Sequence, residues 1–280
     1  MALVINTNIM SLNAQRNLVR SNDALSVSVQ RLSSGLRINS AKDDAAGLAI
    51  SEKVNAQVRS IQVAIRNAQD GISLAQVAEG GLSEIGNILA RMRELAEEAA
   101  NGTLGDTERS ALDNEYQQLK SEIDRIANIT EFNGVKLLDG SKSTTGVTLQ
   151  VGFQNSTNDR INFFSGIGAT NSTNLGITGT FGTISAAANA QSALTQIDSA
   201  IATVAERRGT LGAVQNRLES TINNLRIASE NLTAANSRIR DADFAYETAL
   251  FTRNQILVQA GTAILAQANV IPQNALTLLR

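Results

Sequence analysis

The sequence predicts a mainly α fold: an elongated antiparallel helical rod or coiled coil with a small β-hairpin region. Three observations predict it. Apolar residues recur every seven positions towards both ends of the 280-residue chain. Between the two ends, residues 141–185 contain 27 Gly, Ser, Thr or Asn out of 45 and only three charges. Aromatic residues make up 3% of the chain, which favours narrow helix–helix seams over one thick core.

The first helical segment carries a narrow apolar stripe. Its members are Leu18, Leu25, Val29, Leu32 and Leu36. Gly35 and Asn39 interrupt the pattern, and the spacing of Ser40 and Asp43 predicts the cap of a new helix.

The second helix is predicted to be long. Two series at seven-residue spacing mark it: Ile61, Ala68, Ala75, Leu82, Leu89 and Ala96, and then Ala78, Ile85, Met92 and Ala99. Residues 61–99 alone would span about 60 Å at the helical rise, and Asn101-Gly102 predicts the end of the helix. A third helix is expected from near Asp106, whose carboxylate is placed to cap its first turn.

The hydrophobic period then changes to that of strands. Residues 134–138, 147–153 and 160–164 alternate or are rich in β-branched side chains. Asp139-Gly140 and residues 155–158 are turn sequences. We therefore expect a small β-hairpin unit.

After Ser185 the apolar residues again recur with the period of a helix. The strict heptad series is Leu211, Leu218, Leu225, Leu232 and Ile239. Gly209 and Gly212 allow a bend in this helix, and Pro272 predicts a kink or fraying in a last helix over about 243–279.

The two chain ends are predicted to bind partners. Their apolar stripes are Leu18, Leu25, Leu32 and Leu36 at the first end and Ile256, Ile264, Leu276 and Leu279 at the second. The ends can pair with each other, and such a pair still leaves apolar faces exposed, which indicates a partner surface. The alternative is that both ends dock on the main helical bundle.

Composition excludes several functions. Without Cys or His, the chain has no disulfide, thiolate nucleophile, Ser-His-Asp triad or imidazole metal ligand. Adjacent carboxylates such as Asp43-Asp44 point apart on a helix, so they are poor acid–base pairs and an enzyme is not expected. We expect no cofactor and no metal, since calcium-loop spacing is missing. The net charge of −2 gives no basic surplus for nucleic acid and permits self-association.

No membrane segment is expected. The first 16 residues lack a basic region before an apolar one, unlike a cleaved signal peptide. Residues 256–271 are too short and too polar to span a bilayer.

Several stretches resemble bacterial flagellin. At the first end they are Ala2–Asn8, Ser11–Gln15, Arg31–Gly47 and Asn67–Ser73; at the second they are Leu211–Arg217, Ser237–Asp243 and Leu276–Arg280. The resemblance covers roughly residues 1–140 and 186–280. It implies that 1–43 and 241–280 are paired terminal helices of the inner filament core, and that 44–240 form a helical rod domain with a β region at about 132–185. The large outer domains of many flagellins are absent, because about 20 residues (165–185) stand in their place.

The resemblance also implies function and partners. It implies a structural subunit that assembles with copies of itself into a helical tubular filament for motility, after export by the flagellar type III apparatus. Implied partners are the hook–filament junction and filament cap proteins and an export chaperone on the C-terminal segment. The implied location is extracellular, in the flagellum, although the sequence leaves a periplasmic filament open.

Arg91, Leu95 and Glu115 are similar to the flagellin stretch bound by the flagellin-sensing Toll-like receptor, with Ala90 replacing a common polar residue. The alternative role for these residues, compatible with the first, is packing between subunits. The terminal Leu278–Arg280 is similar to the part of flagellin that intracellular sensors bind.

Two other classes remain open from the sequence. One is a hook–filament junction protein of the same superfamily, which would not make long filaments from short seeds. The other is a secreted host-binding module, which would be a monomer that seeds cannot elongate.

Overall fold

The structure is a computed structural model that describes residues 7–164 and 167–277. Five helices dominate it: α1 (Ile9–Ser34), α2 (Ala45–Ala99), α3 (Asp106–Ile129), α4 (Ala187–Arg240) and α5 (Phe244–Thr277). The chain divides into a terminal unit, Met1–Val58 with Glu230–Arg280, and a central unit, Arg59–Ser229. The mainly α fold predicted from the sequence is confirmed.

The connection from α1 to α2 is fixed by two neighbouring carboxylates. Asp43 Oδ2 accepts hydrogen bonds from the backbone N–H of Asn39 at 3.1 Å and of Ser40 at 2.9 Å, and from Ser40 Oγ at 3.0 Å. The backbone bond from Ser40 is the largest cause of the lowered pKa of Asp43. Asp44 Oδ1 accepts from the Gly47 N–H at 2.8 Å, which is the helix cap itself. The expected Ser40–Asp43 cap is therefore a turn, and the residue that caps α2 is Asp44, four residues after Ser40.

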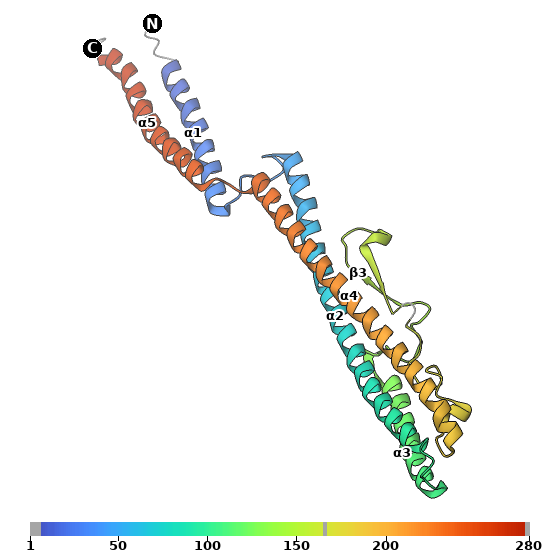
Figure 1. The fold of residues 1–280 in the computed structure, drawn as a ribbon. Coiled ribbons are helices and arrows are strands. Elements are labelled where there is room, and N and C mark those ends of the chain that lie inside the picture. Colours follow the sequence, from blue (N-terminus) through green and yellow to red (C-terminus); the bar gives the residue numbers. More distant parts are fainter. Residues whose placement is uncertain (1–6, 165–166, 278–280) are drawn as a thin grey trace. The chain divides into compact units, whose positions relative to one another are not determined.

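In the central unit, α2, α3 and α4 run alongside one another (Figure 1). The second-helix series predicted from the sequence is fully buried: Ile61, Ala68, Ala75, Leu82, Leu89 and Ala96 are all inaccessible to solvent. The last four of them share one core cluster with Tyr116 and Ile123 of α3 and with small residues of α4 such as Ala190 and Ala193. Ala68 belongs to a second cluster with Leu218 and Ile222 of α4. Small side chains on α4 allow the helices to approach closely.

The returning helix α4 runs without interruption through Gly209 and Gly212. Both glycines face open space, so neither marks a close packing contact. The glycines therefore do not interrupt the helix. At the start of α5, Asp243 Oδ1 accepts hydrogen bonds from the N–H groups of Ala245 and Tyr246 and caps the helix.

The β region consists of two small antiparallel sheets. β1 (Glu131–Phe132) pairs with β2 (Val135–Lys136), and β3 (Val147–Gln150) pairs with β4 (Arg160–Phe163). Asn133 and Gly134 join β1 to β2 with φ angles of 49° and 76°, the left-handed conformation of a tight hairpin turn. The expected strand at 134–138 is therefore shorter, because Gly134 belongs to the turn.

Candidate functional site

α1 and α5 form an antiparallel helix pair in the terminal unit (Figure 1). Near one end of the pair, Ser11 Oγ donates a hydrogen bond to Asn269 Oδ1 at 2.8 Å, and Asn8 Nδ2 donates to the Ala268 carbonyl at 2.8 Å. Near its middle, Leu18 lies against Gly261, where an added Cβ would be 3.1 Å from Leu18 Cδ1. These contacts confirm that the two chain ends can pair with each other.

The predicted stripe on α1 lies in this pair. Leu18, Leu25 and Leu32 are half-buried, at the spacing that faces α5. Leu36 is also half-buried and forms an isolated antiparallel bridge with Asp241. The first-end stripe is thus largely covered within one chain.

The predicted residues on α5 lie differently. Ile256 is 58% exposed and Ile264 is 60% exposed, so these large apolar side chains face away from α1. Leu276 lies in α5 but its side chain, like all of Leu279, lies outside the described residues. The sequence pattern grouped two sets of residues that the structure places on different sides.

Ile256 and Ile264 are part of a larger set, which we call the outer apolar residues. The set comprises Ile9, Met10, Leu12, Val19, Val27 and Val29 of α1 and Phe244, Tyr246, Ile256, Leu257, Ile264 and Val270 of α5. Ile9, Leu12 and Val19 line a shallow hollow of about 700 Å³ together with Gln15, Arg16 and Arg20. Over Phe244–Thr277 the only charged residues are Glu247 and Arg253, and Glu247 is buried. An apolar, nearly uncharged helix face of this size is typical of a surface that a partner covers.

A second surface site joins α2 to α3 in the central unit. Arg91 Nε and Nη2 both donate to Glu115 Oε1, at 3.0 and 2.9 Å, while Nη1 donates to Glu94 Oε2 at 2.8 Å. The bonds to Glu94 and then Glu115 raise the pKa of Arg91. The structure therefore brings Arg91 and Glu115 together. Leu95 is only 1% exposed and belongs to the core, so its side chain supports this surface from beneath.

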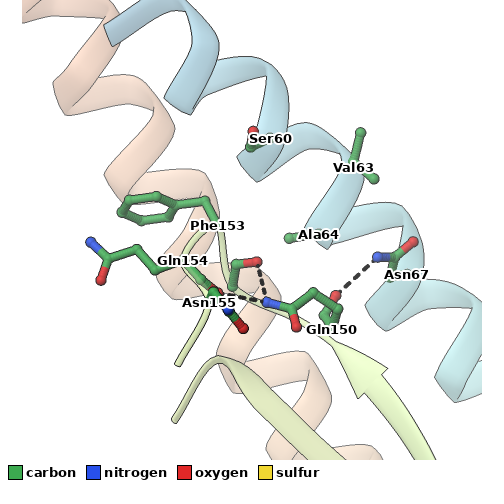
Figure 2. A pocket seen from close by; sticks show the side chains of 9 residues that line it. Ser60, Val63, Ala64, Asn67, Gln150, Phe153, Gln154 and Asn155 are labelled. Atoms are coloured by element: carbon green, nitrogen blue, oxygen red, sulfur yellow. Dashed lines mark hydrogen bonds between the residues drawn. The ribbon is translucent and has the colours of Figure 1, made fainter. Parts of the chain in front are cut away.

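A hollow of about 350 Å³ lies between α2 and the segment after β3 (Figure 2). It is lined by Ser60, Val63, Ala64 and Asn67 of α2 and by Gln150, Gly152, Phe153, Gln154 and Asn155. Asn67 Nδ2 donates to the Gln150 carbonyl at 2.9 Å and ties the two walls together. The lining contains no Asp, Glu, Lys, Arg or Tyr, so this hollow offers no general acid or base that could activate the Ser60 hydroxyl.

Sequence reasoning missed several polar contacts. Asp113 and Asp124 of α3 accept hydrogen bonds from Ile184 and Ser172, which anchors the segment before α4. Arg31 and Glu247 form an ion pair between α1 and α5. Charges at seam positions of a heptad pattern could have revealed this second contact, but no sequence signal marks the first.

Within the described ranges, no helix is both long and apolar enough to cross a bilayer. The same residues contain no cluster of three acidic side chains that could hold a metal ion. The structure is thus that of a mainly helical protein whose terminal helices expose large apolar side chains.

Comparison with known proteins identifies the family. Residues 5–143 match the bacterial flagellin N-terminal helical region, and residues 194–279 match the C-terminal helical region. The chain is 49% identical to a flagellin of Halalkalibacterium halodurans, over 99% of this chain and 100% of that protein. It is 46% identical to a flagellin of Bacillus subtilis, over 99% of each chain. The chain belongs to the bacterial flagellin family.

A solved structure of a putative flagellar hook-associated protein from Vibrio parahaemolyticus shares the fold, with a TM-score of 0.60 over 71% of this chain and 100% of that one, at 16% identity. Family membership favours the filament subunit over the junction protein and the host-binding module. The protein is a structural subunit of the bacterial flagellar filament and not an enzyme, and its place is the extracellular filament.

Proposed function

We propose that copies of this flagellin hold one another in the filament through the outer apolar residues of α1 and α5. The observation that carries this proposal is the exposure of Ile256 and Ile264 on a helix whose other side already packs against α1. Burying such side chains is favourable by about 25 cal/mol per Å². A contact between unlike faces that does not close on itself then extends into a helical fibre.

Within this proposal the predicted stripe residues divide into two roles. Leu18, Leu25, Leu32 and Leu36 hold the chain ends together, and Ile256 and Ile264 face neighbouring copies; the predicted role of Leu276 and Leu279 in polymerisation rests on side chains outside the described residues. Residues 1–43 and 241–280 then form the inner domain of the filament, and residues 44–240 form the rod domain.

Seeded elongation tests the proposal. The double variant Ile256→Ser/Ile264→Ser removes two apolar side chains that the intrachain pair does not use. We expect it to keep its helix content by circular dichroism but to elongate from short filament seeds at least about tenfold more slowly, since each lost contact weakens every subunit addition. The matched control is Gln255→Ser, a polar change on the same exposed helix. Equal elongation by the double variant and this control would remove the proposal.

The export and assembly partners follow from the same surface. Before assembly, the exposed apolar side chains of α5 would associate with other copies unless another protein bound them. This supports a chaperone that binds the C-terminal segment between synthesis and type III export. At the two ends of the filament, the junction and cap proteins would meet the same faces as a neighbouring subunit. Co-purification of the full chain with each candidate, compared with the Ile256→Ser/Ile264→Ser variant, tests these partners. Undiminished capture of the variant would contradict the shared surface.

Arg91 and Glu115 support a second role, recognition by the host Toll-like receptor that senses flagellin. Their ion pair presents a fixed guanidinium and carboxylate on the exposed side of α2 and α3. The same side is suited to packing between subunits, and the two roles are compatible. Leu95 would contribute by holding α2 in place.

A receptor reporter assay with Arg91→Ala tests recognition. Arg93→Ala is the matched control, because Arg93 lies on the same helix and is also ion-paired, with Asp198 at 2.8 Å. We expect signalling to fall for Arg91→Ala and to stay unchanged for Arg93→Ala. Equal signalling by both variants would remove the receptor role.

A further inference from the structure

The α1–α5 pair contains a partly buried ion pair at one end. Arg31, in the last turn of α1, has Nη1 at 3.5 Å from a carboxylate oxygen of Glu247, in the first turn of α5. Glu247 is only 4% exposed. Arg31 Nε and Glu247 Oε1 are buried and have no hydrogen-bond partner among the described residues. An ion pair with unbonded buried atoms contributes little net stability, so its value lies elsewhere.

The small and aliphatic residues of the seam discriminate poorly between registers, so apart from the backbone bonds between the connectors (Arg37 to Arg240 and Ala242 to Gly35) the register depends on polar contacts. The covered positions of α1 alternate three and four apart and are mostly small or aliphatic: Ser11, Ala14, Leu18, Ser21, Leu25, Ser28 and Leu32. On α5 the corresponding positions include Asn254, Val258, Gly261, Leu265 and Ala268. In such a repeat, sliding one helix by seven residues again places seam residues against seam residues.

The observed contacts belong to one register. From Ser11 to Leu18 to Arg31 along α1, the partner moves back along α5 from Asn269 to Gly261 to Glu247. A slip of seven residues would bring Ser11 opposite Thr262. Glu247 would then lie near Ala24 and Leu25, without a counter-charge. Arg31 would lie opposite Arg240, and a buried charge without its partner is strongly unfavourable.

We propose that the Arg31–Glu247 ion pair selects the register of the α1–α5 helix pair. Register decides which outer apolar residues of the two helices lie side by side. The next step rests on the proposed function above, in which the outer apolar residues hold neighbouring copies together. In that case the ion pair also decides whether a chain end can join the filament. Arg31 and Glu247 are thus positioning residues that need no contact with the neighbouring copy.

Introduced cysteines can report the register directly, because the chain contains no Cys of its own. Ser11→Cys with Asn269→Cys reports the observed register. Ser11→Cys with Thr262→Cys reports the slipped one. The full-length chain is oxidised with diamide, and the intrachain disulfides are quantified by peptide mass spectrometry.

Three backgrounds complete the experiment. In the background that keeps Arg31 and Glu247, we expect the yield of the 11–269 disulfide to exceed that of the 11–262 disulfide by at least about tenfold. In Arg31→Met/Glu247→Leu we expect the two yields to approach each other within about threefold, with helix content unchanged, because the apolar pair no longer penalises the slip. The swapped pair, Arg31→Glu/Glu247→Arg, should restore the preference. The matched control is Glu52→Leu, which breaks another ion pair of the terminal unit, Arg240–Glu52, outside the seam, and leaves Arg240 in place.

Three results would overturn the proposal. One is a tenfold preference for the 11–269 disulfide that persists in Arg31→Met/Glu247→Leu, and another is the formation of neither disulfide in the background that keeps Arg31 and Glu247. The third is failure of Arg31→Glu/Glu247→Arg to restore the preference, and this result tests the proposal even if the apolar variant loses helix. The cross-links are read before any polymer forms, so they stay separate from the elongation assay. Slow or normal elongation of Ile256→Ser/Ile264→Ser leaves the register result standing.

Discussion

Asp124 of α3 holds Ser172 with both of its carboxylate oxygens. Oδ1 accepts from the Ser172 backbone N–H at 2.7 Å, and Oδ2 accepts from Ser172 Oγ at 2.9 Å. Further along the segment, Asp113 Oδ1 accepts from the Ile184 N–H at 2.7 Å and from Thr183 Oγ1 at 2.9 Å. The segment between β4 and α4 is therefore attached to α3 at two points.

Removing the first attachment should destabilise the central unit. We expect Asp124→Ala to lower the free energy of unfolding by about 2 kcal/mol, because two hydrogen bonds to a charged, half-buried acceptor are lost. Denaturant unfolding followed by circular dichroism measures the change, and hydrogen exchange at the Ser172 amide should accelerate. Asp198→Ala is the control, since it removes only a surface ion pair with Arg93 and should cost under about 1 kcal/mol. An effect of Asp124→Ala no larger than the control would contradict this prediction.

Two glycines in long helices should respond differently to alanine. At Gly212 of α4 an added Cβ meets open space, so Gly212→Ala should stabilise the protein by about 1 kcal/mol through helix propensity. At Gly261 of α5 the same Cβ would lie 3.1 Å from Leu18 Cδ1, and the crowding should cancel that gain. Thermal unfolding of both variants measures the contrast, which a similar gain at both positions would refute.

The buried phenol of Tyr116 should make the central unit sensitive to alkali. Burial raises the pKa of Tyr116 in the folded protein, whereas the unfolded chain ionises near its usual value of about 10. The unfolded state therefore loses the proton first. Stability that is complete below pH 10 should fall above it by up to about 1.4 kcal/mol per pH unit.

Absorbance at 295 nm reports the ionisation, because the chain has no Trp and only two Tyr. In a Tyr246→Phe background, the phenolate signal should appear together with the loss of helix. Phenolate formation near pH 10 with the helices intact would show that burial does not control this group.

The two carboxylates before α2 should act on different groups. Asp44→Ala should cost about 1 kcal/mol as a lost helix cap, with faster hydrogen exchange at the Gly47 amide. Asp43→Ala should instead speed exchange at the Asn39 and Ser40 amides. Because hydrogen bonding lowers the pKa of Asp43, protection of these amides in the unmodified chain should be present at neutral pH and lost only as the pH falls through that lowered pKa. Identical exchange patterns in the two variants would argue against separate roles.

Sequence periodicity predicted the helices well, because each heptad position of α2 from Ile61 to Ala96 is buried. Periodicity shows that a face is covered and not what covers it. For that reason it grouped Leu18, which packs against Gly261, with Ile256, which faces outwards. The same limit applies to Leu95, whose burial depends on tertiary packing. The carboxylates that hold Ser172 and Ile184 act across tens of residues, so no local pattern predicts them.

The bridge between Leu36 and Asp241 has a mechanical consequence. The Arg37 N–H donates to the Arg240 carbonyl at 2.7 Å, and the Ala242 N–H donates to the Gly35 carbonyl at 3.0 Å, so the outgoing and returning connectors are joined by their backbones. A force that pulls on one connector is therefore transmitted to the other through these backbone hydrogen bonds. Since the bonds are made by main-chain atoms, side-chain substitution at Leu36 or Asp241 leaves this load path in place.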